Sequence, residues 1–268
     1  MRRGARRADP IYAGNMLRLR EPSTDWSIEI DDAGPVLRRL HLDLAAGRLS
    51  GPLHALRIHL VADVLARTLE FRGAQVLQLA TLPDPAESID LPSELSLAAL
   101  GIQAPPAVAG SEARPSAFRK PADVRLAGPE AAGDGAMPPA LAVGVVKTDN
   151  GDGYDEPLAL RLVLLSVGYH EAVVVDGARL AEAHETLERW RRRVAEWAAG
   201  PSGAPDQATV SRCSQHLDDD LDTPSVLAAL NTLENDPDIA PGTKFETFSI
   251  LDRVLALELP RDIGRYAV

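Results

Sequence analysis

The stretch from residue 36 to residue 80 constrains the fold most, because it reads as strand, helix and strand in succession. Residues 36–44 alternate apolar and polar side chains, the period of a half-buried strand. Apolar residues recur at helical spacing from Leu53 to Phe71, after a proline suited to a first turn and before Gly73, which suits a helix end. Residues 74–80 form a second strand. A strand, helix and strand of this length predict a βαβ unit and hence a parallel sheet.

The middle of the chain is rich in Pro, Ala and Gly. We expect a short helix over 91–100, capped by Ser93, and a strand near 122–126. The rest of the region from about 101 to 139 is typical of a mobile insert. Residues 140–147 are apolar enough for a buried strand, and Asp-Asn-Gly follows as a turn signal.

Beyond Pro157 the pattern becomes helical, with helices expected over 158–169, 176–199, 207–216, from Asp222 or Thr223 onward, and over 245–257. Pro224 in a first turn marks a strong helix start. The fold class is therefore α/β: a parallel sheet followed by an α-helical bundle. We divide the chain into an N-terminal arm (1–35, with a short strand near 26–30), a sheet domain (36–153) and a helical domain (154–268).

Composition excludes several classes of protein. No apolar run reaches the ~18 residues of a membrane span, and no apolar stretch follows the basic N-terminus as in a secretory signal. The single cysteine, Cys213, excludes an intramolecular disulfide and a multi-cysteine zinc site. We therefore expect a cytoplasmic protein without a membrane partner.

The net charge of −11 disfavours a broad nucleic-acid surface, since phosphate binding needs a basic stripe. A basic cluster on the predicted helix 176–199 runs against this trend. It is interpreted either as a solvated helix face or as a residual edge for RNA or a partner. Its members are Arg189, Arg191, Arg192 and Arg193.

Several segments resemble the cysteinyl-tRNA synthetase family, which includes the cysteine ligase of mycothiol biosynthesis. Residues 154–223 are similar to the region after the family's catalytic core, and LDDDLDTP (217–224) is the most specific match. Residues 63–76 are similar to the end of its first helix and the next strand. The resemblance implies a class I synthetase-like Rossmann domain, here truncated, in an enzyme that activates cysteine with ATP.

The resemblance also implies where ATP and zinc would be held. Counting back from Asp63 places residues 52–55 at the family's HIGH motif, with neither motif histidine matched, whereas a second register makes His54 the first motif histidine. The candidate ATP-binding residues are then Gly51, His54 and Arg57, and Lys147 is the one lysine near the expected KMSKS loop, whose own lysines are missing. The alternative for His54 is an ordinary helix residue. Asp43 stands where the family's first zinc cysteine would stand, so zinc is not expected.

Three functions stay open. The first is a degenerate paralogue without standard cysteine activation, acting through an unknown protein partner. The second is an active, diverged ATP-dependent ligase that uses His54 and Lys147, with ATP as its cofactor. The third is a tRNA-associated binding protein, which the acidic charge disfavours.

Overall fold

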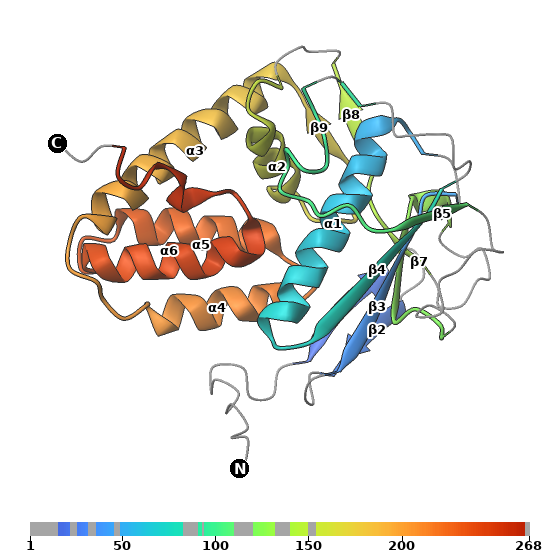
Figure 1. Ribbon diagram of the computed structural model, residues 1–268, viewed down its shortest axis with the longest axis horizontal. Helices are drawn as coiled ribbons and strands as arrows, with labels where there is room; N and C mark the ends of the chain where they lie inside the picture. Colours follow the sequence, from blue (N-terminus) through green and yellow to red (C-terminus); the bar gives the residue numbers. More distant parts are fainter. Residues whose placement is uncertain are drawn as a thin grey trace.

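The computed structural model divides into a sheet half and a helical half, and helix α1 (Pro52–Phe71) lies between them (Figure 1). The prediction of an α/β fold with a following helical bundle is confirmed. The structure describes residues 16–21, 26–31, 36–45, 49–82, 91–92, 94–109, 120–131, 140–149 and 154–265.

The sheet has five parallel strands in the order β5-β4-β3-β6-β7. The chain moves outward from β3 to β5 on one side and then returns to add β6 and β7 on the other. The strand order therefore reverses between β3 and β6, and in open parallel sheets ligands bind at the carboxyl ends beside such a reversal. The strands are β3 (Leu37–Asp43), β4 (Gln75–Leu82), β5 (Ala107–Ala109), β6 (Val124–Ala127) and β7 (Ala140–Ala142).

Helix α1 forms where the periodicity predicts it. Gly51 precedes it at φ 138°, a conformation that a side chain rarely allows, and Pro52 needs no hydrogen-bond partner in the first turn. Leu56 and Leu60 of α1 share one buried cluster with Leu40 and Leu42 of β3. Because α1 contacts both the strands and α6, nearly every side of it is buried.

Two small sheets lie outside the main one. β1 (Leu17–Glu21) pairs antiparallel with β2 (Trp26–Ile30), and β8 (Val146–Thr148) pairs in parallel with β9 (Val173–Val175). β2 falls on the expected short strand of the arm, whereas β1 and β9 were not expected. β1 joins the two halves: Glu21 Oε2 accepts a hydrogen bond from the Ala142 nitrogen (2.7 Å), and Asp220 Oδ1 accepts one from the Arg20 nitrogen (2.8 Å).

Two expected elements differ from the structure. The single strand expected over 140–147 is divided into β7 and β8, because the chain at Gly144 leaves the sheet to pack against residues 168–171; a Cβ atom at Gly144 would lie 2.0 Å from the Glu171 carbonyl oxygen. The helix expected over 91–100 was wrong, since the described residues there form a turn ending at Gly101 (φ 68°).

Three helices of the helical half begin after an aspartate that caps them, and Asp222 is the cap that the sequence predicted. Asp176, Asp206 and Asp222 each accept a hydrogen bond from the backbone nitrogen three residues later, which satisfies a free N–H group of the first turn. α6 starts four residues before the predicted position, with its proline in the first turn. The helices are α2 (Pro157–Leu165), α3 (Gly177–Ala198), α4 (Gln207–Asp218), α5 (Thr223–Asn235) and α6 (Pro241–Leu255), with short 3-10 turns η3 (Pro129–Ala131) and η4 (Leu259–Asp262).

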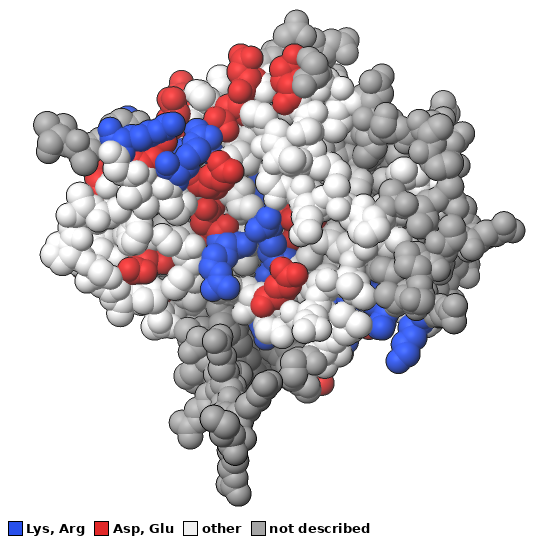
Figure 2. Space-filling view, viewed as in Figure 1, with Lys and Arg blue, Asp and Glu red and all other residues white. Residues whose placement is uncertain are grey.

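Surface charge is mixed. On the face drawn in Figure 2, basic and acidic side chains lie interspersed, and neither sign forms a continuous stripe there. Among the described residues, no helix is both long enough and apolar enough to cross a membrane.

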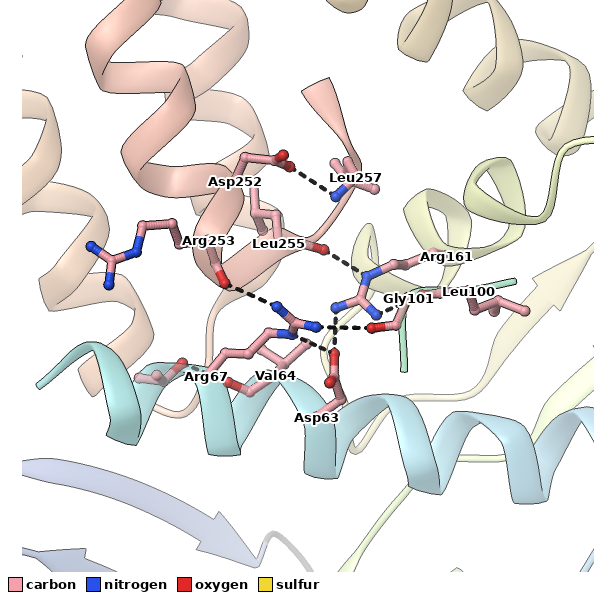
Figure 3. A network of polar contacts seen from close by, with 11 residues as sticks. Asp63, Val64, Arg67, Leu100, Gly101, Arg161, Asp252, Arg253, Leu255 and Leu257 are labelled. Carbon is pink, nitrogen blue, oxygen red and sulfur yellow. Dashed lines mark hydrogen bonds and ion pairs between the residues drawn. The ribbon is translucent and has the colours of Figure 1, made fainter. Parts of the chain in front are cut away.

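A buried polar network joins the two halves beside α1 (Figure 3). Asp63 Oδ2 accepts hydrogen bonds from Arg161 of α2 (2.7 Å) and from Arg67 of α1 (2.9 Å). The two guanidinium groups also donate to four backbone carbonyl oxygens. These carbonyl oxygens belong to the 97–101 turn and to the end of α6, so the network ties α1 to both. The four residues are Leu100, Gly101, Arg253 and Leu255.

Candidate functional site

The reversal between β3 and β6 places a candidate site at the carboxyl edge of the sheet. Asp43 and Ala127 are paired neighbours at the ends of these two strands. The first turns of α1 follow β3 and supply Gly51, His54 and Arg57, the residues that the sequence singled out. The segment between β7 and β8 lies against the same turns. The structure thus brings the two expected ATP-binding segments together.

His54 is buried (1% exposed) and makes hydrogen bonds through both ring nitrogens. Nδ1 accepts from the Ser50 nitrogen (3.2 Å), and Nε2 lies 3.0 Å from the Val143 carbonyl oxygen. A neutral ring with its proton on Nε2 satisfies both contacts. Burial lowers the pKa of His54, which favours this neutral form, and the nearby Arg57 charge acts in the same direction.

Arg57 is fully buried, and its guanidinium group binds backbone carbonyl oxygens. Its guanidinium donates to the carbonyl oxygens of Gly144 (2.9 Å), Glu171 (2.5 Å) and Gly168 (3.0 Å). Burial lowers its pKa to about 10, and the charge of Glu171 opposes that shift. Three of its five N–H groups are used in this way, so the arginine acts as a brace between α1 and the segments that flank β8 and β9.

The end of β3 holds an ion pair where the resemblance places a zinc cysteine. Asp43 Oδ2 accepts from Arg125 of β6 through Nε (2.9 Å) and a terminal nitrogen (2.9 Å). Two residues before Asp43 in β3, His41 places its Nε2 atom 2.8 Å from Thr81 Oγ1 of β4. His41 and Arg125 are both buried. Sequence reasoning missed His41, Thr81 and Arg125; their signal was polar residues near the ends of otherwise apolar strands.

Within the part of the chain that the structure describes, no group of three or more His, Cys, Asp or Glu side chains is arranged to hold a metal ion. Asp43, the nearest carboxylate to the expected zinc position, is bound by the Arg125 guanidinium. A cationic neighbour of this kind competes with a metal ion for the carboxylate oxygens. The donor set around β3 therefore does not fit zinc.

The remaining candidates lie elsewhere. Lys147 is exposed on β8, beside Val174 of β9. Arg191 is buried and donates to the Leu257 carbonyl oxygen (2.9 Å), and Arg189 pairs with Glu234 of α5 (3.2 Å). Arg192 and Arg193 are exposed, and Arg193 pairs with Glu196 on the same helix. The cluster thus presents two exposed guanidinium groups to solvent.

The acidic residues before α5 make contacts that connect elements of the fold. Asp218 pairs with Arg72 at the end of α1, and Asp219 pairs with Arg20 of β1. Asp220 accepts from the Tyr169 hydroxyl (2.7 Å), in a left-handed conformation (φ 68°). These carboxylates point to separate partners rather than to one centre, and they fix β1 and α1 to the helical half.

The strand order, the α1 start and the helical half that follows define an α/β protein with a Rossmann-type parallel sheet and a helical bundle. Part of the chain is homologous to a group of L-cysteine ligases. It is 46% identical over 80 residues to the L-cysteine:1D-myo-inositol 2-amino-2-deoxy-alpha-D-glucopyranoside ligase of Gordonia bronchialis (30% of this chain, 18% of that protein). The ligases of the same name from Streptomyces griseus and Thermobispora bispora are 42% identical over 86 residues and 39% identical over 90.

The similarity is partial in both directions. The matched segment covers 32% of this chain and 20% of the Streptomyces griseus ligase, so the chain spans about a fifth of the length of the curated relatives it matches. No protein-family model matches the chain.

Proposed function

We propose that this chain is a degenerate relative of the L-cysteine ligases, without their cysteine-activating chemistry, and that it acts as a binding or accessory protein for a protein partner. The observation that carries the proposal is how the residues at the ATP and zinc positions are used. His54 and Arg57 bind the chain's own backbone, and Asp43 binds Arg125. The side chains of these three residues already bind other groups of the protein and are not directed at a phosphate or metal ion.

The physical consequence is a loss of transition-state stabilisation. In phosphate chemistry, unpaired N–H groups and mobile cations must face the developing charge. Three of the five Arg57 N–H groups bind carbonyl oxygens, and breaking those bonds would leave buried carbonyl oxygens without partners. Losing a single transition-state donor costs ~10²–10³ in rate, so several such losses remove measurable activity.

The alternative is an active, diverged ATP-dependent ligase. One observation favours it: His54 and the Val143–Gly144 segment meet at the carboxyl edge of the sheet, beside the reversal of strand order. A ligand that displaced the Val143 carbonyl oxygen from His54 could bind the His54 side chain near the N-terminus of α1. A tRNA-associated function would rest on Arg192 and Arg193, with Arg189 and Arg191 already engaged.

The deciding experiment is ATP–pyrophosphate exchange dependent on L-cysteine, run beside an ATP-binding titration, with the Gordonia bronchialis ligase as positive control. We expect no exchange above the enzyme-free background. Exchange that depends on cysteine and disappears in His54→Gln would overturn the proposal in favour of the active ligase. A salt-sensitive tRNA complex lost in Arg192→Glu with Arg193→Glu would favour the third function.

A further inference from the structure

A cleft of about 370 Å³ opens in the helical half between α3 and α5, with the end of α2 as its floor. Leu162, Val163 and Val167 make the floor apolar. None of the lining residues comes from the sheet or from α1, so the cleft is separate from the carboxyl edge of the sheet. The side chains along its walls are polar at the rim and apolar below: Ser166, Arg179, Glu182, Ala183, Thr186, Trp190, Leu227 and Asn231.

Contacts at both ends hold this cleft open. At one end the Trp190 indole N–H donates to Glu234 of α5 (3.0 Å), and Arg189 pairs with the same carboxylate. At the other end the Thr223 hydroxyl donates to the Leu165 carbonyl oxygen (2.7 Å), which fixes the start of α5 to the end of α2. Thr223 and Glu234 lie one turn before and one turn after Leu227 and Asn231, the α5 residues that line the cleft. The space is therefore preformed, which lowers the cost of binding a ligand.

The rim carries two opposite charges that are not paired with each other. Arg179 and Glu182 lie one turn apart on α3, where Cβ atoms are about 5–6 Å apart. Among the described residues neither side chain has an ion-pair partner, and the Arg179 guanidinium makes one hydrogen bond, to the Val174 carbonyl oxygen (3.1 Å). Further along the walls, the Thr186 hydroxyl and the Asn231 amide nitrogen have no hydrogen-bond partner within the described ranges.

We propose that this cleft binds a small zwitterionic ligand of amino-acid or dipeptide size with an aliphatic side chain. Arg179 receives its carboxylate and Glu182 its ammonium group, since the pair offers both charges at a matching spacing. The side chain lies on the floor formed by Leu162 and Val163. The Thr186 hydroxyl, one turn beyond Glu182 on α3, accepts a hydrogen bond from the same ammonium group. The volume lies in the range of small-molecule sites, about 300–1,000 Å³.

The test follows the Trp190 indole N–H resonance of the full ¹⁵N-labelled chain, assigned with Trp190→Phe. L-leucine and L-leucyl-L-leucine are the two probes, and they distinguish an amino acid from a dipeptide. Isovalerate and isoamylamine keep the alkyl group but lack the ammonium and the carboxylate respectively. We expect a saturable shift with one of the two probes, and binding of both analogues weaker by about tenfold or more.

Variants locate the binding. Glu182→Gln and Arg179→Gln are substitutions at exposed positions that leave folding intact. Each should weaken binding of the probe by about tenfold, because one charge-assisted hydrogen bond is lost. Glu185→Gln, exposed on the same helix but outside the cleft lining, should bind as the parent does. No saturable shift with either probe at millimolar concentration overturns the proposal. So does a shift that Glu182→Gln and Arg179→Gln leave unchanged, or equal binding of isoamylamine.

Discussion

At the scale of single residues, His59 is the clearest source of pH-dependent stability. It lies in the middle of α1, 4% exposed, and its Nδ1 has no hydrogen-bond partner among the described residues. Burial lowers its pKa to about 4, against about 6.5 in an unfolded chain. The unfolded state therefore takes up a proton first. The stability that neutral His59 contributes is complete above pH 6.5 and is lost as the pH falls toward 4.

We expect the free energy of unfolding to fall by about 2 kcal/mol more between neutral pH and about pH 5 in the parent than in His59→Leu. Leucine keeps the buried volume and cannot titrate. Urea unfolding at the two pH values measures the difference. His184→Gln, on the exposed face of α3, serves as the matched control and should keep the full fall. An equal fall in His59→Leu would mean that other groups set the pH dependence.

At the scale of elements, the turn between β7 and β8 depends on Gly144. A Cβ there would lie 2.0 Å from the backbone oxygen of Glu171, which cannot move aside as a side chain can. Gly144 also donates to the Tyr169 carbonyl oxygen (2.8 Å), and its own carbonyl accepts from Arg57. Gly144→Ala should therefore separate the two backbones and weaken the Arg57 brace.

We expect Gly144→Ala to lower the free energy of unfolding by about 3 kcal/mol, measured by urea denaturation. Gly177→Ala is the matched control: nothing lies within 4 Å of its added Cβ, and the residue starts α3. It should be neutral or stabilise by about 0.5 kcal/mol. Similar losses in both variants would show that the close approach at Gly144 is not the cause.

Elements with a local signal could be predicted from the sequence. α1 and α3 follow from their helical spacing of apolar residues, and α5 follows from Asp222, whose capping bond spans three residues. β9 has three residues and owes its existence to pairing with β8, some 27 positions earlier in the register of Val146 with Val173. Such a strand has no periodicity of its own to detect.

The same limit applies to the candidate site. The resemblance could single out His54 and Arg57 at the expected position of the HIGH motif. It could not show that their partners are the carbonyl oxygens of Val143 and Gly144, which lie 89 and 87 residues away. A family resemblance indicates where a residue stands in the fold. The contacts made by its polar atoms decide whether it is free to bind a ligand.

At the scale of the whole molecule, α1 is shared by both halves, and the Asp63 network is the polar part of that joint (Figure 3). Arg161 is fully buried, and its charge is balanced by Asp63. Its other donors bind the carbonyl oxygens of Leu100 and Leu255. We therefore expect the sheet half and the helical half to unfold in a single transition.

Asp63→Ala tests this coupling. It leaves the Arg161 charge buried without its partner, so the free energy of unfolding should fall by about 3–5 kcal/mol. Arg161→Met in the same chain should restore part of that loss, since the unpaired charge is gone while the two carbonyl oxygens stay without donors. Glu29→Gln, which removes the exposed pair with Arg18, should cost less than about 0.5 kcal/mol.

The decisive readout compares the two halves in the same variant. With Trp26→Phe in both the parent and the variant, tryptophan fluorescence follows Trp190 and Trp197 in α3, and hydrogen exchange follows the β3 amides in the sheet. If α1 couples the halves, Asp63→Ala lowers the free energy of unfolding of the sheet half and of the helical half by the same amount. Neither half can open without exposing the apolar face of α1 that the other half covers. A loss confined to α3, with β3 still protected as in the parent, would show instead that the sheet is stable without the helical half.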